Sequence, residues 1–113
     1  MKYSHYAPNA PMIIVKGSSD FLQRNINEAQ LNGQRVGVLT TEDNKDTYVA
    51  DVILTCGKKD DMSSVAHNLY SVLREFNKYD VDIIFSESFS DYGLGQAVMN
   101  RLMKASNHRV TEE

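Results

Sequence analysis

The chain has no tryptophan, a single cysteine, two prolines and no long apolar run. One cysteine excludes an internal disulfide framework and fits a reducing compartment. A membrane-spanning helix needs about 20 consecutive apolar residues, and a secretory signal needs an apolar stretch near the N-terminus. Since the sequence contains neither, we expect a cytoplasmic protein without a membrane partner.

The sequence also has no excess of positive charge. It carries 12 lysine and arginine residues against 15 acidic ones, a net charge of −3, and Lys58 and Lys59 are its only adjacent basic pair. Domains that bind nucleic acid on their own usually present a basic stripe, because neutralising phosphates supplies most of the affinity. We therefore expect any contact with RNA to be indirect.

Four short apolar runs indicate the fold. They lie at residues 12–15, 36–39, 52–54 and 81–85, and helical patterns separate most of them. This rhythm is typical of βαβ units, and nearly continuous apolar runs are typical of strands that helices cover on both faces. We predict a small three-layer Rossmann-like α/β sandwich, with a mostly parallel sheet of four to five strands flanked by helices. The strand order stays open.

The connections show helix signals of different strength. Ser18 or Ser19 can cap a first helix that ends near Gly33, and Asp60 or Asp61 can open a second one. Apolar residues at helical spacing mark a third helix after Gly93. The polar segment 41–50 predicts one or two helical turns, and residues 107–113 are interpreted as a frayed tail.

The first eleven residues form a segment of another kind, which we call the strap. It holds the aromatic and polar side chains of Tyr3, His5 and Tyr6, and Pro8 and Pro11 favour extended backbone around them. Such side chains can stack on a base or cover a neighbouring site. They can equally pack on the surface of their own domain, and the residues alone leave both readings open.

Two stretches of the chain resemble a known family. The strap reads MKYSHYAP from Met1 to Pro8, and the last helical pattern reads GLGQAVMNRLMKAS from Gly93. Together they resemble the C-terminal domain of threonylcarbamoyl-AMP synthases, preceded by the end of the linker that joins it to a YrdC-like catalytic domain. The likeness continues through the apolar runs, but the Ser-Pro-Gly that opens the family's linker is missing here.

The resemblance implies that catalysis belongs to a different domain from this one. Threonylcarbamoyl-AMP synthases use L-threonine, bicarbonate and ATP to make the donor for a tRNA modification, and their catalytic and magnesium-binding residues belong to the YrdC-like domain. This chain is then an excised domain or half of a split protein, with no catalytic residue, metal site or cofactor of its own. The implied organisation is a linker strap at 1–11, an accessory domain at 12–106 and a tail at 107–113.

The resemblance also gives the strap a role. In the family this linker lies against the YrdC-like domain and covers the pocket where ATP and threonine react. Tyr3, His5 and Tyr6 are therefore candidate contacts on the ATP side in the intact enzyme.

A second candidate is an anion or small-ligand loop at Ser18, Gly93 and Gly95, where helices follow strands. The glycine fingerprint for dinucleotides is incomplete, because Val98 stands at its third position. Turn chemistry therefore explains these glycines more simply than a phosphate site does. A regulatory domain that senses a small molecule or nucleotide, and an RNA-binding module, remain as alternative functions.

Other chemistry-bearing residues favour structural roles. Glu42, Asp43 and Glu87 follow predicted strands, but loop acids are most often simply solvated. His67 and His108 are separate from any metal-ligand spacing, and Cys56 has no motif for nucleophilic chemistry.

Overall fold

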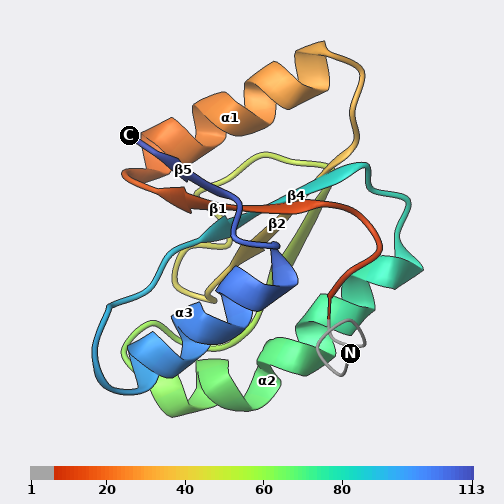
Figure 1. Cartoon of the computed structure of the whole chain (residues 1–113). Coiled ribbons are helices and arrows are strands. Elements are labelled where there is room, and N and C mark those ends of the chain that lie inside the picture. The colour runs from red at the N-terminus through yellow and green to blue at the C-terminus, as the bar shows by residue number, and fades with distance from the viewer. Residues whose placement is uncertain (1–6) are drawn as a thin grey trace.

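The computed structural model describes residues 7–113 and shows an α/β fold (Figure 1). Its elements follow in the order β1 (Met12–Lys16), α1 (Ser19–Leu31), β2 (Val36–Thr40), β3 (Val52–Thr55), α2 (Met62–Glu75), the short 3₁₀ helix η2 (Phe76–Lys78), β4 (Ile83–Glu87), α3 (Gly93–Ala105) and β5 (Val110–Glu112). Tyr3, His5 and Tyr6 lie outside the described residues.

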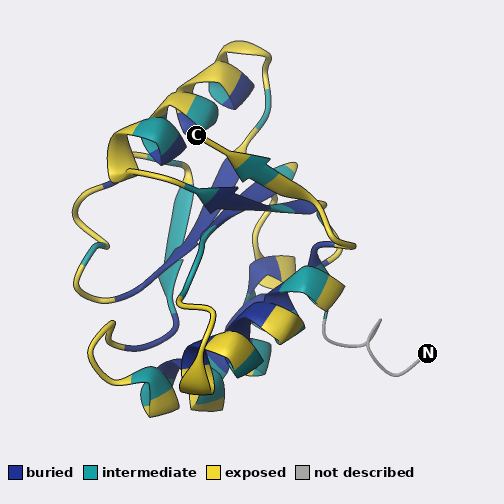
Figure 2. Ribbon diagram, turned by 60° about the vertical axis from the view of Figure 1, so that its left-hand side comes forward, coloured by how far each residue is buried: buried dark blue, intermediate teal, exposed yellow. Residues whose placement is uncertain are grey.

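The five strands form one parallel sheet in the order β3-β2-β4-β1-β5. In its centre Ile14 pairs with Ser86, and Val38 pairs with Phe85. Helix α1 covers one face, while α2 and α3 pack side by side on the other (Figures 1 and 2). The predicted three-layer Rossmann-like sandwich is thus confirmed, and the strand order is now known.

The core has one layer on each face of the sheet. Ile14, Leu69, Phe76 and Leu102 belong to the layer beneath α2 and α3. Leu22, Ile26 and Tyr48 belong to the layer beneath α1. Figure 2 shows the buried residues on the sheet and on the inward sides of the helices. Burial on both faces explains why the strands read as continuous apolar runs.

Local signals set the ends of α1 and the start of β4. The Ser18 hydroxyl accepts a hydrogen bond from the Phe21 backbone N–H at 3.1 Å, and Gly33 turns the chain after the helix with φ +84°. Strand β4 begins at Ile83, two residues later than predicted. The Asp82 carboxylate caps the adjacent strand by accepting from the Arg35 N–H at 2.8 Å.

The prediction of a frayed tail at 107–113 is wrong. Residues Asn107 and His108 adopt positive φ values of 55° and 61°, which redirect the chain after α3. Strand β5 then pairs in parallel with β1, for example Ile14 with Val110. No apolar run marks this strand in the sequence, because β5 is largely exposed.

The segment 41–50 contains hydrogen-bonded turns rather than a helix. The backbone N–H of Asn44 bonds to the Thr41 carbonyl at 3.0 Å, and that of Thr47 bonds to the Asn44 carbonyl at 2.9 Å. These single turns bring Tyr48 back under α1, where it is buried.

Candidate functional site

The order of the strands creates a crevice between β1 and β4. Helix α1 carries the chain from β1 towards β2 on one face, and α3 carries it from β4 towards β5 on the other. Ligands of parallel α/β sheets usually bind where the connections after two adjacent strands leave on opposite faces of the sheet. The binding site then lies beyond the carboxyl ends of those strands. A cavity of about 270 Å³ lies here, and its lining includes Ser18, Tyr48, Lys59, Glu87 and Ser88. We call it the switch-point cavity.

Glu87, at the end of β4, is the fixed charge of this cavity. Its Oε1 accepts from the Thr40 hydroxyl at 2.8 Å, and its Oε2 accepts from Asn44 Nδ2 at 3.0 Å and from the Tyr48 hydroxyl at 2.5 Å. All three donors are neutral and come from β2 and the turns after it. The carboxylate is therefore held in one position without a neutralising cation among residues 7–113.

The surroundings of Tyr48 shift the pKa of its phenol group. Its burial raises the pKa of the phenol well above the usual range, and the hydrogen bond to Glu87 and the negative charge of Glu87 act in the same direction. The phenol therefore stays protonated and donates to the carboxylate.

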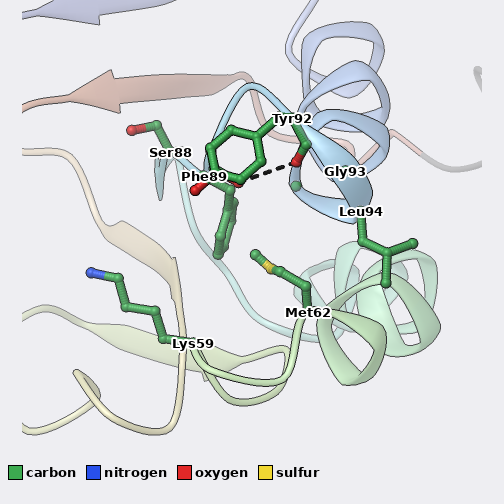
Figure 3. Close-up of a pocket in the computed structure, with 9 residues that line it drawn as sticks. Lys59, Met62, Ser88, Phe89, Tyr92, Gly93 and Leu94 are labelled. Carbon is green, nitrogen blue, oxygen red and sulfur yellow. Dashed lines mark hydrogen bonds between the residues drawn. The ribbon is translucent and has the colours of Figure 1, made fainter.

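A second cavity of about 590 Å³, which we call the apolar cavity, adjoins the first. Met62, Phe89, Tyr92 and Leu94 provide its apolar lining, and Lys59 stands on its rim. Figure 3 shows Phe89 and Tyr92 on one side of the opening and Met62 on the other. Tyr92 and Leu94 remain 78% and 51% exposed, so this cavity is open to solvent.

The structure places the predicted loop residues in different cavities. Ser18 lines the switch-point cavity, whereas Gly93 and Gly95 line the apolar cavity. Gly93 has φ +61°, and a Cβ at Gly95 would collide with Ser90. Backbone geometry thus accounts for both glycines.

The N-terminus of α1 already receives a carboxylate from the protein itself. The Ser18 N–H donates to Glu113 Oε1 at 2.8 Å, and Glu113 Oε2 lies 3.6 Å from Arg24 Nη2. These contacts, led by the Ser18 backbone N–H, lower the pKa of the Glu113 carboxyl group. An external anion would have to displace this side chain.

The remaining candidates are separate from both cavities. Asp43 accepts a hydrogen bond from the Lys59 backbone N–H at 2.9 Å, and Cys56 is buried at the end of β3. Within residues 7–113 no group of histidine, cysteine and acidic side chains is arranged to hold a metal ion. None of the helices in this part of the chain is long and apolar enough to cross a membrane.

Sequence reasoning missed Tyr48 and Thr40 as partners of Glu87. Tyr48 lies in a polar segment 39 positions before the glutamate, and no local pattern connects them. Only the adjacency of β2 and β4 brings these side chains together.

The layers, the strand order and the crevice define a Rossmann-like α/β domain. The family described as Threonylcarbamoyl-AMP synthase, C-terminal domain matches residues 1–107, and the chain belongs to this family. The resemblance found in the sequence is thereby confirmed.

Curated relatives extend this assignment. The threonylcarbamoyl-AMP synthase of Bacillus subtilis is 51% identical over 110 residues, which cover 97% of this chain and 32% of the relative. That of Pyrococcus abyssi is 40% identical over 114 residues, again 97% of this chain and 32% of the relative. The chain thus spans about a third of the length of the curated relatives it matches.

Solved structures agree with the fold. The Pyrococcus abyssi Sua5 protein in complex with L-threonine matches 96% of this chain and 31% of its own, with a TM-score of 0.82 and 36% identity. The C-terminal Sua5 domain from Pyrococcus horikoshii matches 95% of this chain and 100% of its own, with a TM-score of 0.74 and 33% identity. In that second structure the matched chain is the domain alone.

Proposed function

We propose that this chain is the non-catalytic accessory domain of a threonylcarbamoyl-AMP synthase, and that it anchors a linker which closes over the active site of a YrdC-like domain. The parent enzyme would combine ATP, L-threonine and bicarbonate into threonylcarbamoyl-AMP for tRNA modification. ATP and magnesium would bind to the YrdC-like domain. Family membership and the one-third coverage of the synthases support this proposal.

The observation that carries the proposal is the attachment of the strap's last residues to the body. Pro8 is buried, and the Asn9 N–H donates to Asn77 Oδ1 at 2.8 Å. The Pro11 carbonyl accepts from the Ile84 N–H at 2.9 Å, which continues the ladder between β1 and β4. Ala10 packs against the core layer of α2 and α3. The strap therefore leaves the domain from a fixed point.

A fixed point has a kinetic consequence. A linker held at both ends by folded domains samples only a small volume, so its closure over a neighbouring pocket is an intramolecular step with a high effective concentration. Tyr3, His5 and Tyr6 stand eight, six and five residues before Pro11, within reach of such a pocket if the strap is extended.

A chimera tests this function. We would join the chain to the preceding portion of the Bacillus subtilis synthase and measure threonylcarbamoyl-AMP formation from ATP, L-threonine and bicarbonate. We expect turnover by the chimera and none by the chain alone. The double variant Tyr3→Ala/Tyr6→Ala should slow the chimera about tenfold, an effect of the size that one or two lost contacts produce.

Two further variants separate anchoring from folding. Asn77→Ala removes the acceptor for the Asn9 N–H and should lower turnover without unfolding the domain, because Asn77 is exposed. Leu31→Ala, at an 87% exposed position on α1, should leave turnover unchanged. Full turnover in the double tyrosine variant would refute the role of the strap.

A further inference from the structure

The switch-point cavity and the apolar cavity adjoin each other, and together we call them the crevice. Lys59, Ser88 and Phe89 line both of them, so these residues form their common boundary. Each cavity offers a different chemistry. The apolar cavity presents Met62 and Leu94, and the switch-point cavity presents a carboxylate.

Two opposite charges face this crevice without meeting. Among the described residues the ion pairs within 4.0 Å are Arg24 with Glu113 and Arg35 with Asp51, and neither Lys59 nor Glu87 takes part in one. Lys59 bonds to Asp43 through its backbone N–H, and its ammonium group attracts the Asp43 carboxylate without forming an ion pair within 4.0 Å. Both charges therefore remain available to a ligand.

Glu87 also retains room for one more donor. A carboxylate offers about four lone-pair positions. Oε2 accepts from Asn44 and Tyr48, but Oε1 accepts only from Thr40. The protein donors of Glu87 are neutral and already hold its side chain in place. A cationic donor at Oε1 would therefore form a charge-assisted hydrogen bond at little entropic cost for ordering the carboxylate.

The order of these groups selects the class of ligand. Along the crevice come the apolar side chains, then Lys59 and Ser88 at the shared boundary, and then Glu87. A nucleotide carries hydroxyl groups between its base and its phosphate, so it would need the carboxylate in the middle. A free α-amino acid carries its carboxylate and ammonium group on one carbon, with the side chain pointing away from both.

We infer that the crevice binds a free α-amino acid with an apolar side chain. Its ammonium group donates to Glu87, its carboxylate faces Lys59 and the Ser88 hydroxyl, and its side chain lies between Met62, Phe89 and Leu94. Ser88 makes no hydrogen bond through its hydroxyl group to any part of the chain that the structure describes, so it is available for this contact.

Exposure in the apolar cavity supports the same occupant. Tyr92 and Leu94 extend into solvent at the start of α3, and Figure 3 shows them around the opening. A bound apolar side chain would remove part of this surface from water, which favours binding in proportion to the area covered. The total space of the two cavities exceeds what glycine or alanine can fill, so larger side chains gain more.

The test is an NMR titration of the ¹⁵N-labelled chain, whose matched Pyrococcus horikoshii counterpart is a domain on its own. The probes are L-leucine, L-methionine, L-phenylalanine, L-threonine and glycine. We expect saturable amide shifts at Ser88, Phe89 and Gly95 with the three apolar amino acids. Threonine and glycine should bind at least about tenfold more weakly, because they bury less apolar surface.

Two leucine analogues isolate the charges. Isoamylamine lacks the carboxylate and 4-methylpentanoate lacks the ammonium group, and each should bind about tenfold or more weakly than leucine because one charge-assisted hydrogen bond is lost. Equal binding of all three compounds would refute the zwitterion and leave a merely apolar site. Absence of any shift up to about 10 mM leucine, a concentration that would saturate a millimolar site, would refute the proposal altogether.

Variants assign the contacts. Glu87→Gln should weaken leucine binding about tenfold and leave the affinity for 4-methylpentanoate unchanged. If this variant is too unstable to titrate, Lys59→Gln at an exposed position provides the reciprocal test, with loss for leucine and none for isoamylamine. Lys58→Gln is the matched control, because Lys58 lines neither cavity, and should bind leucine normally. Wild-type affinity in Lys59→Gln would overturn the assignment.

Discussion

Tyr48 and Glu87 are joined by a hydrogen bond of 2.5 Å between Oη and Oε2, across 39 positions of sequence. The bond connects the turns after β2 to the end of β4 and closes one side of the switch-point cavity. It combines a buried phenol with a carboxylate, and hydrogen bonds to charged groups are among the stronger ones in proteins.

Replacing Tyr48 by phenylalanine should destabilise the domain. The variant keeps the buried ring but removes the hydroxyl donor, so we expect a loss of about 2 kcal/mol in the free energy of unfolding. Urea denaturation measures this value. Tyr79→Phe is the control, since Tyr79 is 43% exposed and should change stability little. Equal stability of the two variants would show that the bond to Glu87 contributes nothing.

The same residue predicts a dependence on alkaline pH. Because the folded state raises the pKa of Tyr48, its contribution is fully present below the pKa of an unfolded tyrosine, about 10, and is lost as the pH rises above that value. The difference in unfolding free energy between the wild-type chain and Tyr48→Phe should therefore shrink above about pH 10. A difference that grows with pH would contradict the direction of the shift.

The thiol of Cys56 should react slowly with alkylating reagents in the folded protein. Burial raises its pKa to about 12, and the nearby negative charge of Glu87 adds to the effect. The reactive species is the thiolate, so alkylation near neutral pH should be about a hundredfold or more slower than in the chain unfolded by guanidinium. Equal rates in the two states, followed by mass spectrometry, would show that β3 opens readily to solvent.

Asp51 should stabilise the protein only while it is ionised. Its Oδ2 accepts from the Val36 N–H at 2.7 Å and from Gln30 Nε2 at 3.1 Å, and the backbone bond is the first cause of its lowered pKa. The contribution is present above the unfolded pKa of about 3.9 and disappears as the pH falls through the folded value. The difference in unfolding free energy between the wild-type chain and an Asp51→Asn variant should therefore depend on pH.

We expect Asp51→Asn to cost about 1 kcal/mol near neutral pH, and the difference from wild type to vanish at strongly acid pH. Urea denaturation at both values measures it. Asp46→Asn, at an exposed carboxylate without a hydrogen bond in the described chain, should have no effect at either pH. A cost that persists in acid would mean that the side-chain amide itself disturbs β2.

Gly37→Ala should also be destabilising. A Cβ at this position of β2 would lie 2.9 Å from Cε1 of Phe76, a ring that is almost fully buried. Overpacking of this kind costs about 1 to 3 kcal/mol, because neighbours must leave their preferred rotamers. Gly33→Ala tests a different cause, since that glycine meets no neighbour but has φ +84°. An unchanged melting temperature in Gly37→Ala would show that Phe76 can move.

The strands that the sequence predicted are those with buried or partly buried apolar residues. The runs at 12–15, 36–39 and 52–54 lie within β1, β2 and β3, of which β1 and β2 are mostly buried and β3 is partly buried along its whole length. Strand β5 could not be predicted, since its residues are largely exposed and its stability comes from main-chain pairing with β1 rather than from apolar side chains.

The candidate site was less predictable than the fold. Glu87 was recognised as an acid after a strand, but its three donors come from β2 and an irregular segment, and only the strand order places them beside it. The roles of Tyr3, His5 and Tyr6, and the boundary of the strap at residue 11, stay predictions. These three side chains lie outside the described residues, and their proposed contacts would be with a YrdC-like domain.

Strand β1 directly follows the strap and is hydrogen-bonded to β4 on one side and to β5 on the other. A pull transmitted along the linker would therefore load β1 lengthwise, and its ladder bonds would have to rupture together rather than one after another. Such shear loading makes the sheet a firm mechanical support. If the strap closes over a neighbouring domain as proposed, this support would let the body stay folded under the load.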